Sequence, residues 1–438
     1  MKKQPNTQET ADTPPPNLRK AEPLAKLSES PKINRMVAAN YLHKQVEADT
    51  KAKKFRGLPP AAPNYRQIWD FLKSNAGPWI WNYLKFAFSP RWPFPVYGSG
   101  GKNGIYKIKP VKAGDPVRLA IAGDWGTGTE EAWMIGDLIE KSKPDFTVHL
   151  GDVYFVGDQD EIEQNYLGMK KNGYDGVKWP KGSQGSFALN GNHEMYANGK
   201  PYFETFLPTL GMKADSKGQE ASYFCLETEH WRLIALDTGY NAVGFPILSQ
   251  IPGLKEIPFI GGNCHLEQSV VDWLRDVVGV KSRPMPTVLL GHHNYFSAFK
   301  EQVYTKQAKQ IAPLFGGQEI IWIWGHEHRL AIYDKCKTDE GMLVHGRCLG
   351  HGGMPIDLAV PGASSAPCRF YDARSHELAG HGEVGENGFV KMSIDGGKLS
   401  LEYVDIHNKV LLAEAFSALP DGTMKYEFKD HGILTRVN

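Results

Sequence analysis

The chain has 438 residues, and its 50 lysines and arginines nearly balance its 49 aspartates and glutamates, so the formal net charge is only +1. This balance gives little support to general nucleic-acid binding, which usually requires a strong basic excess, and we expect no specific nucleic-acid partner. No apolar run approaches the ~18 residues that cross a bilayer, and the five cysteines are not closely paired, so membrane-spanning and disulfide-framework classes are excluded.

Residues 1–56 are polar and punctuated by prolines, which predicts a disordered tail with one helix near Met36–Glu47. The tail carries a local excess of positive charge. It is either a solvated segment or a weak electrostatic arm for an anionic surface. Because the start of the chain lacks the apolar stretch of a secretory signal and the thiols are scattered, we expect a cytoplasmic location.

Residues 57–110 form an aromatic-rich extension that contains Trp69, Trp79, Trp81 and Trp92. We expect this segment to pack against the following domain as an N-terminal brace. The alternative is that its aromatic side chains make a weak contact with a membrane surface or with another protein.

From Val117 the texture of the chain changes, and short apolar or β-branched runs alternate with amphipathic stretches. The runs are VRLAIAG, DFTVHLG, SFALNG, WRLIALD, PTVLLG and EIIWIWG. This alternation predicts an α/β sheet buried on both faces. After Phe389 the pattern predicts antiparallel hairpins with short turns. Two long stretches, Thr238–His265 and Gly352–Gly388, are expected to be irregular, and loops of this length are usually functional or disordered.

Polar residues follow five of the predicted strands directly. They are Asp124, Asp152, Asn192 with His193 and Glu194, His292 with His293, and His326 with His328. Open α/β sheets place their sites at this edge. Each residue alone has a structural explanation, such as a helix cap or a turn. The ordered combination is hard to obtain by chance and indicates one shared site.

Carboxylate, amide and imidazole groups form a mixed set of oxygen and nitrogen ligands that suits Fe, Mn, Zn or Co rather than Ca. His326 and His328 are two residues apart, so on a regular strand they would point the same way and reach adjacent ions. Asp152 could bridge two ions ~3.5–4 Å apart, which would acidify a shared water molecule. The sequence has no G-x-S-x-G motif and no P-loop.

The order of D-x-G, G-D, G-N-H-E, H and G-H-x-H resembles the calcineurin-like metallophosphoesterase superfamily. Within it, Asp124-Trp125-Gly126 is most similar to the purple acid phosphatase branch. The resemblance spans about residues 117–328. It implies a four-layer α/β/β/α sandwich of two mixed sheets, with a dinuclear metal site at the carboxyl ends of the strands. Residues 111–438 would then be the catalytic domain.

The resemblance also implies roles for single residues. Asp124, Asp152 and His328 would hold the first metal ion, with Asp152 bridging to the second. Asn192, His292 and His326 would hold the second ion, and His293 is the less favoured alternative to His292. His193 would contact the phosphate and donate a proton to the leaving oxygen. Glu194 would orient neighbouring groups.

Two positions depart from the family pattern. Gly126 stands where many members have a metal-binding histidine. Phe155 stands where purple acid phosphatases have a tyrosine ligand, and Tyr154 comes one residue early. Because neighbouring residues on a strand face opposite ways, Tyr154 is expected to point away from the site unless the loop is irregular. We therefore expect a ligand-poor first metal site and no purple tyrosinate–iron colour.

Other histidines and acids are expected to be structural. His345, His351, His376 and His381 lie in or near the glycine-rich segment after the last motif. His351 near the metals, and His376 or His381 reaching over the site, are the alternatives. His149 is expected in the core or behind the ligands, and Asp237 is expected to accept structural hydrogen bonds.

These inferences predict a metal-dependent phosphoric ester hydrolase with two divalent or trivalent ions, most simply Fe, Mn or Zn. A metal-bridging hydroxide would attack a small phosphate ester, with a phosphomonoester as the first candidate and His193 as the proton donor. Two alternatives stay open. One is a phosphodiesterase or nucleotide hydrolase at the same site, and the other is a weakly active metal-binding scaffold protein.

Overall fold

The computed structural model describes residues 90–98, 102–171, 175–215, 218–243, 262–299, 303–356, 358–362, 366–378, 382–419 and 423–437. The predicted tail, the helix near Met36–Glu47 and the first part of the aromatic extension, with Trp69, Trp79 and Trp81, lie outside these residues. So do His381 and most of the predicted loop Thr238–His265.

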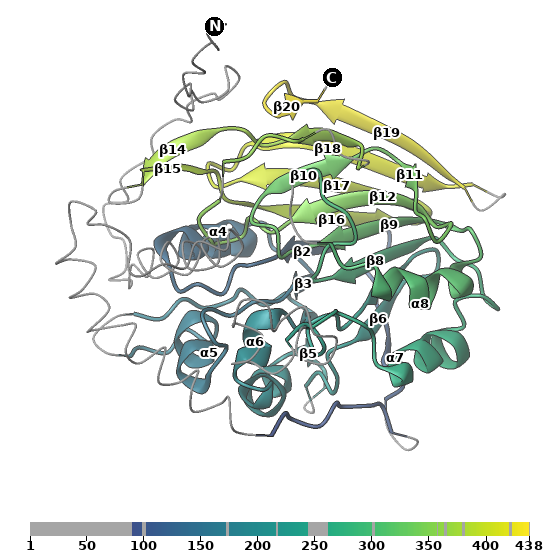
Figure 1. Ribbon diagram of the computed structural model, residues 1–438, viewed down its shortest axis with the longest axis horizontal. Coiled ribbons are helices and arrows are strands. Elements are labelled where there is room, and N and C mark those ends of the chain that lie inside the picture. Colours follow the sequence, from purple (N-terminus) through teal and green to yellow (C-terminus); the bar gives the residue numbers. More distant parts are fainter. Residues whose placement is uncertain are drawn as a thin grey trace, which may run out of the picture.

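Two large sheets form the centre of the molecule (Figure 1). The eight-stranded sheet has the order β19-β18-β17-β16-β2-β3-β4-β5. Its strands are β2 (Val117–Ala122), β3 (Phe146–His149), β4 (Gly185–Ala188), β5 (Gly211–Met212), β16 (Gly388–Asp395), β17 (Lys398–Asp405), β18 (Val410–Ala418) and β19 (Met424–Asp430). Strands β2, β3 and β4 run parallel, whereas the others pair antiparallel, so the sheet is mixed.

The ten-stranded sheet has the order β1-β6-β7-β8-β9-β12-β10-β13-β20, with β11 paired to β12. Its strands are β1 (Ile105–Lys107), β6 (Phe224–Glu227), β7 (Arg232–Ala235), β8 (Thr287–Gly291), β9 (Glu319–Trp324), β10 (Leu330–Tyr333), β11 (Cys336–Lys337), β12 (Leu343–Leu349), β13 (Cys368–Tyr371) and β20 (Thr435–Arg436). Strands β7, β8, β9 and β12 are parallel. A separate hairpin joins β14 (Ser375–Leu378) to β15 (Gly382–Gly385).

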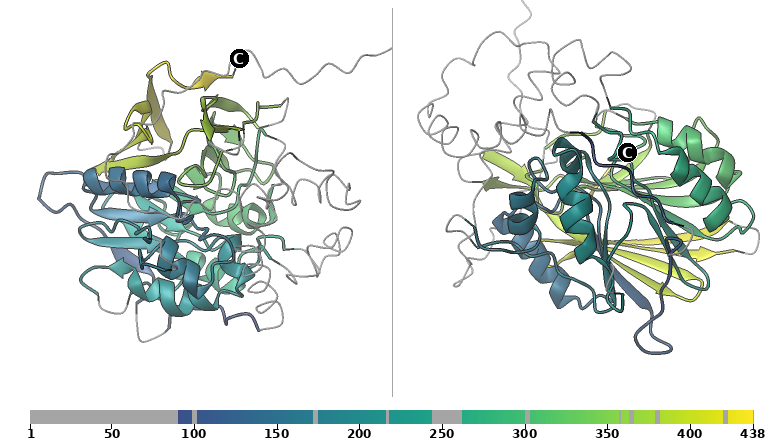
Figure 2. Two further views of the ribbon diagram at one scale, coloured as in Figure 1. Left: turned by 90° about the vertical axis from the view of Figure 1, so that its left-hand side faces the viewer. Right: turned by 90° about the horizontal axis from the view of Figure 1, so that it is seen from below.

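Helices cover the outer face of each sheet (Figure 2, right). On the eight-stranded sheet they are α4 (Glu130–Lys141), α5 (Gln159–Asn165) and α6 (Asn192–Tyr196), followed by a π-helical turn (Tyr202–Phe206) and a 3-10 turn (Leu207–Thr209). On the ten-stranded sheet they are α7 (Gln268–Trp273), which continues into a π-helical turn (Leu274–Val278), and α8 (Lys306–Phe315).

The alternation of side chains along each strand separates the layers. Leu119 and Ile121 of β2 belong to the core between the two sheets. Ala120 and Ala122, which face the other way, pack with Ile135 of α4. Both faces are buried in the parallel strands β3, β4, β8 and β9, which explains why these strands read as continuous apolar runs. The architecture is the predicted four-layer α/β/β/α sandwich.

Six predicted apolar runs coincide with β2, β3, β4, β7, β8 and β9, and the hairpins predicted after Phe389 are β16, β17 and β18. The expectation that Gly352–Gly388 is irregular is wrong in part, because this stretch contains β13, β14 and β15. These strands are short, and their sequences CRFY, SHEL and GEVG show little alternation of apolar and polar residues.

The described end of the aromatic extension packs on the domain as a brace. The Tyr97 hydroxyl donates to the Tyr223 carbonyl at 2.6 Å, and the rings of Phe94 and Tyr223 stack with centroids 5.7 Å apart. The Tyr240 hydroxyl donates to the Trp92 carbonyl at 2.8 Å. The structure confirms the brace for residues 90–98, and the contact of the extension with a membrane or a partner stays a prediction.

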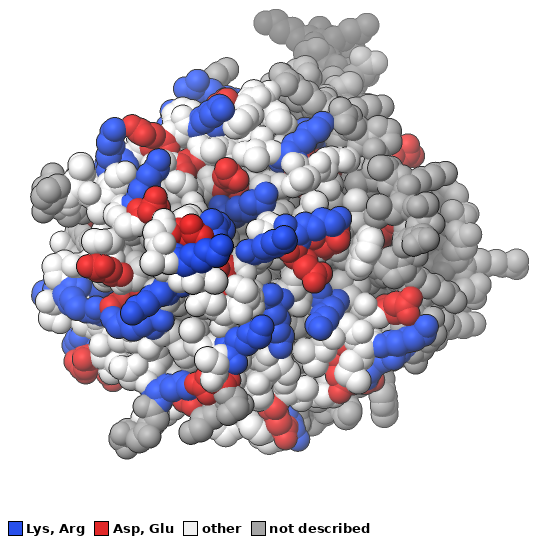
Figure 3. Space-filling view, turned by 180° about the vertical axis from the view of Figure 1, so that it is seen from behind, with Lys and Arg blue, Asp and Glu red and all other residues white. Residues whose placement is uncertain are grey.

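Basic and acidic side chains are interspersed over the face shown in Figure 3, in keeping with the balanced charge of the sequence. Among the helices of the described residues, none has the length and apolar character required to span a bilayer.

Candidate metal centre

The predicted site residues follow the carboxyl ends of five strands. They are Asp124 after β2, Asp152 after β3, Asn192 after β4, His292 after β8, and His326 and His328 after β9. Contacts among them link the two sheets at one edge, because the backbone N–H of His326 donates to Asp124 Oδ2 at 2.8 Å. The structure thus brings together side chains that are scattered along the sequence. Their role as metal ligands stays a prediction.

A first group of side chains surrounds Asp124. Nε2 of His328 lies 3.4 Å from Asp124 Oδ1. The Tyr154 hydroxyl lies 2.8 Å from Asp124 Oδ1 and 3.1 Å from Asp152 Oδ2. It also lies 3.0 Å from His328 Nε2. Two carboxylates, a phenol and an imidazole therefore converge on one small region.

A second group surrounds His292. Its Nε2 lies 3.2 Å from Asp152 Oδ2 and 3.3 Å from Asn192 Oδ1. Ring nitrogens of His292, His293 and His326 lie within 4.8 Å of one another. Asp152 contacts both groups, as the bridging role predicted for it requires. The ring nitrogens of His293 and His326 are close enough to bind one ion together, so distance alone does not distinguish His292 from His293 as the ligand.

The tautomer of His292 favours it as the ligand. Its Nδ1 lies 2.9 Å from the Leu150 carbonyl, which can only accept, so Nδ1 carries the proton and Nε2 is left facing Asp152. Nδ1 of His293 is 3.0 Å from the Thr238 hydroxyl, which can donate or accept, so the tautomer of His293 is not fixed in this way.

The centre is buried and its backbone is strained. Asp124, Asp152 and His292 have exposed fractions of 0%, 1% and 0%. Asp124, Asp152 and His326 have φ angles of 57°, 74° and 66°, in the left-handed region that L-residues rarely adopt. Such conformations persist only where the surroundings impose them, and they cluster at functional sites. The turn geometry also corrects one expectation, because His326 and His328 do not lie on a regular strand.

Charges within the centre compensate each other. Burial raises the pKa of Asp152, but the neighbouring His292 and His193 outweigh it and hold that pKa well below its usual range. Burial likewise lowers the pKa of His292, but Asp152 outweighs it and raises the value to about 9. A cation at this position would replace the imidazolium charge and release its proton, as expected for metal-ligating groups.

His193 lies beside Asp152. Its Nδ1 is 2.6 Å from the Phe155 carbonyl, so Nδ1 carries a proton, and its Nε2 is 3.8 Å from Asp152 Oδ2. Its ring is 4.3 Å from that of Tyr154 and 5.0 Å from that of Tyr196, measured between centroids. Burial lowers the pKa of His193 although Asp152 acts in the opposite direction.

Glu194 orients the backbone, as predicted. Its buried carboxylate accepts hydrogen bonds from the N–H groups of Gly191 at 2.8 Å, Asp152 at 3.2 Å and Val153 at 2.7 Å. These bonds hold the turn after β3 against the start of α6.

Tyr154 corrects the sequence interpretation. Strand alternation predicts that it points away from the site, unless the loop is irregular. β3 ends at His149, however, and Gly151 and Asp152 both have positive φ angles, so the alternation does not continue to residue 154. The hydroxyl that Phe155 lacks is supplied by Tyr154, and the first group is less poor in donors than expected.

Steric contacts explain why a glycine and not a histidine occupies position 126. A Cβ atom at this position would lie 2.9 Å from the Asp152 carbonyl oxygen and 2.9 Å from Val153 Cα. A histidine therefore does not fit here, because the turn that carries Asp152 occupies its place.

The remaining polar residues have structural contacts. Asp237 accepts from Asn190 and from the Tyr240 N–H, as expected. His149 is buried among the rings of Trp125, Tyr166 and Trp179. His345 contacts Glu319 at 2.6 Å, His376 contacts Glu386 at 2.9 Å, and His351 packs on Gly388.

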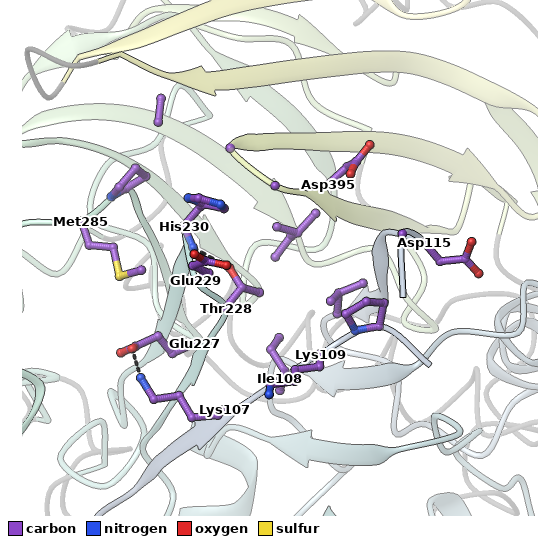
Figure 4. Close-up of a pocket in the computed structure, with 18 of the residues that line it drawn as sticks. Lys107, Ile108, Lys109, Asp115, Glu227, Thr228, Glu229, His230, Met285 and Asp395 are labelled. Atoms are coloured by element: carbon purple, nitrogen blue, oxygen red, sulfur yellow. Dashed lines mark hydrogen bonds and ion pairs between the residues drawn. The ribbon is translucent and has the colours of Figure 1, made fainter. Parts of the chain in front are cut away.

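A cavity of about 1320 Å³ lies elsewhere, where β2, β7 and β8 begin (Figure 4). Two of its basic side chains, Lys107 and Arg283, pair with Glu227 within the lining. Among the described residues, both clusters of three or more potential metal ligands lie at the centre described above and not in this cavity.

The sandwich fold places a buried cluster of Asp and His side chains at the carboxyl ends of its strands, the edge where α/β sheets carry their sites. Residues 117–330 match the family model of the calcineurin-like phosphoesterases, and this part of the chain is a calcineurin-like phosphoesterase domain.

Several solved structures match part of the chain at low sequence identity, with TM-scores below 0.5. A purple acid phosphatase from yellow lupin (Lupinus luteus) seeds is 15% identical with a TM-score of 0.45, over 70% of this chain and 55% of that one. The chain thus spans little more than half of the lupin protein. GAP50, described as the anchor in the inner membrane complex of Plasmodium, is 13% identical with a TM-score of 0.43, over 68% and 88%. A dimetal phosphatase from Danio rerio is 12% identical with a TM-score of 0.38, over 66% and 96%. No curated protein matches the chain.

Proposed function

We propose that the domain is a dinuclear metal-dependent phosphoesterase that hydrolyses a small phosphate ester. The observation that carries the proposal is the position of Asp152, whose buried carboxylate contacts the Asp124 group through Tyr154 and the His292 group directly. This arrangement is the one that a carboxylate shared by two cations requires.

The residues present fit two cations. Asp124, Asp152 and His328 would hold the first ion, and we now add Tyr154 to this set. Asp152, Asn192, His292 and His326 would hold the second. When bound, two cations at these positions would acidify a water molecule and neutralise negative charge on a phosphoryl group. The mixed oxygen and nitrogen donors support Fe, Mn or Zn.

The chain itself would supply proton transfer. Because the Nδ1–H of His193 is committed to the Phe155 carbonyl, Nε2 is the atom that can carry a proton to the leaving oxygen. Tyr154, packed against the His193 ring, would keep the imidazole in place.

A phosphomonoester remains the first candidate for the substrate. The test compares p-nitrophenyl phosphate with bis(p-nitrophenyl) phosphate, using protein reconstituted separately with Fe, Mn and Zn. Faster hydrolysis of the monoester supports the proposal. Hydrolysis of the diester alone would replace it by the phosphodiesterase alternative.

A matched pair of variants distinguishes an enzyme from a metal-binding scaffold protein. His193→Ala should abolish most hydrolysis of phenyl phosphate, a monoester with a poor leaving group, whereas His230→Ala, an exposed histidine in the remote cavity, should not. If the metal-loaded wild-type protein hydrolyses no ester, and if both variants bind metal as the wild type does, the scaffold alternative would be favoured.

A further inference from the structure

Residues 151–158, which carry Asp152 and Tyr154, are named the Asp152 loop. They lie between β3 and α5, so the regular hydrogen bonds of a strand or helix do not pair their backbone N–H groups. Buried N–H groups are nearly always paired, so each needs a partner. Those of Asp152 and Val153 donate to Glu194, and that of Tyr154 donates to the Gly126 carbonyl at 2.9 Å. The second half of the loop uses a different carboxylate.

Glu161, on α5, accepts from three N–H groups of the loop. The bonds come from Phe155 at 2.5 Å, Val156 at 2.8 Å and Asp158 at 3.3 Å. A helix capping box explains only the last and longest of these, because it joins the third helical residue to the N-cap residue, here Asp158. The two shorter bonds reach beyond the helix, so Glu161 does more than cap it.

The peptide unit between Phe155 and Val156 links Glu161 to His193. Its N–H, on Val156, donates to Glu161, and its carbonyl, on Phe155, accepts from His193 Nδ1 at 2.6 Å. Hydrogen bonds in such a chain polarise one another, and those to a carboxylate are the stronger kind. Glu161 thus fixes the direction of the carbonyl that selects the tautomer of His193.

The preceding peptide unit is fixed in the same way. Its N–H, on Phe155, donates to Glu161, and its carbonyl, on Tyr154, accepts from Asn165 Nδ2 at 2.8 Å. Both the donor and the acceptor side chain belong to α5. The backbone on both sides of Phe155 is therefore clamped to this helix, and with it the position of the Tyr154 hydroxyl.

We propose that Glu161 is a positioning residue of the centre, which holds His193 in the Nδ1–H tautomer through the Phe155–Val156 peptide unit. The inference rests on the proposed phosphoesterase function for its catalytic meaning, but the hydrogen-bond chain can be tested without it. Glu161→Gln is the informative variant, because an amide keeps the volume yet offers an N–H₂ group where one backbone N–H needs an acceptor.

The direct test is ¹⁵N-histidine NMR of the metal-free protein. We expect one slowly exchanging, low-field Nδ1–H signal that is absent in His193→Ala. Glu161→Gln should lose or shift this signal, whereas Glu163→Gln, on the same helix but bonded to Gln159 and Lys171, should keep it. If Glu161→Gln does not fold, Glu161→Asp serves instead, because the shorter aspartate side chain cannot reach the N–H groups of both Phe155 and Val156. An unchanged signal in the folded variant would overturn the proposal.

Steady-state turnover of two phosphate esters is a second measurement, and a purely structural role of Glu161 would lower both rates equally. Proton donation matters little for the good leaving group of p-nitrophenyl phosphate and much for phenyl phosphate. Glu161→Gln should therefore lower turnover of phenyl phosphate about 10-fold or more beyond its effect on p-nitrophenyl phosphate, and it should add nothing in a His193→Ala background. Equal losses on both substrates, or additive losses, would contradict positioning. Absence of hydrolysis by wild type would refute the proposed function and leave the NMR test standing.

Discussion

The Tyr154 hydroxyl lies 2.8 Å from Asp124 Oδ1. Under the proposed function it would be a fourth donor to the first metal ion. Tyr154→Phe keeps the ring and removes only this donor. We expect the affinity for the more weakly held ion to fall about 10-fold or more, the usual effect of losing a ligand-supporting group. Competition with a chelator, followed by elemental analysis, measures it.

With iron bound, the wild-type protein should also show a visible charge-transfer band that Tyr154→Phe lacks, which reverses the expectation drawn from Phe155. Phe155→Tyr is the matched control and should not tighten the site, because the hydroxyl position is already filled. Equal chelator sensitivity of Tyr154→Phe and wild type would show that Tyr154 is not a donor.

The approach of Gly191 to Asp152 leaves no room for a side chain. A Cβ atom at residue 191 would lie 2.0 Å from Asp152 Oδ1. Gly191→Ala should therefore displace the shared carboxylate and reduce both metal content and turnover, the latter by about 10-fold or more. Gly397→Ala, whose Cβ would meet nothing within 4 Å, is the control and should behave as wild type. Full metal content and activity in Gly191→Ala would argue against the assigned role of Asp152.

His193→Ala should retain both metal ions and lower turnover of phenyl phosphate ~10²–10⁴-fold, because general acid catalysis of the departure of a poor leaving group typically contributes that much. The measurements are steady-state kinetics and metal analysis of the same preparation. Loss of metal together with activity would instead make His193 a ligand or a support of the centre, and unchanged turnover would remove its catalytic role.

The pair of His376 and Glu386 predicts a pH-dependent stability. Nδ1 of His376 lies 2.9 Å from Glu386 Oε1, and this hydrogen bond raises the pKa of His376. A raised folded-state pKa stabilises the protein below the unfolded value of about 6.5, and the stabilisation disappears as the pH rises through the folded-state pKa. Glu386 also faces His407 at 3.4 Å.

His376→Gln should accordingly destabilise the metal-free protein by about 1 kcal/mol at pH 5.5 and by much less at pH 9. Thermal unfolding of both proteins at the two pH values checks this. A Tm difference that is the same at both values would mean that the charge of His376 contributes nothing.

The parts of the fold that could be predicted from the sequence are those that local patterns specify. β2, β3, β8 and β9 are buried on both faces, so they appear as apolar runs, and the polar residues after them mark the edge where the site lies. The short strand β13 could not be predicted, because it pairs with the distant strands β10 and β20. The local hairpin of β14 and β15 could not be predicted, because SHEL and GEVG show little alternation of apolar and polar residues.

The position of Tyr154 could not be predicted for a similar reason. Strand periodicity does not apply to a turn whose course is set by two carboxylates, Glu194 and Glu161, and by the close approach of Gly126. Nothing in the residues around Glu161 suggests its reach beyond the helix cap. Such tertiary hydrogen bonds decide which of two neighbouring side chains, Tyr154 or Phe155, faces the centre.

The most direct test of the account is the metal stoichiometry of the purified full-length protein and of Asp152→Ala, measured by elemental analysis after equilibration with Fe, Mn or Zn. Asp395→Ala, an exposed aspartate on the β16–β17 hairpin, is the control. A shared carboxylate predicts two ions per chain in wild type and control, and near-complete loss of both in Asp152→Ala. Two ions retained by Asp152→Ala, or at most one ion in wild type, would contradict it.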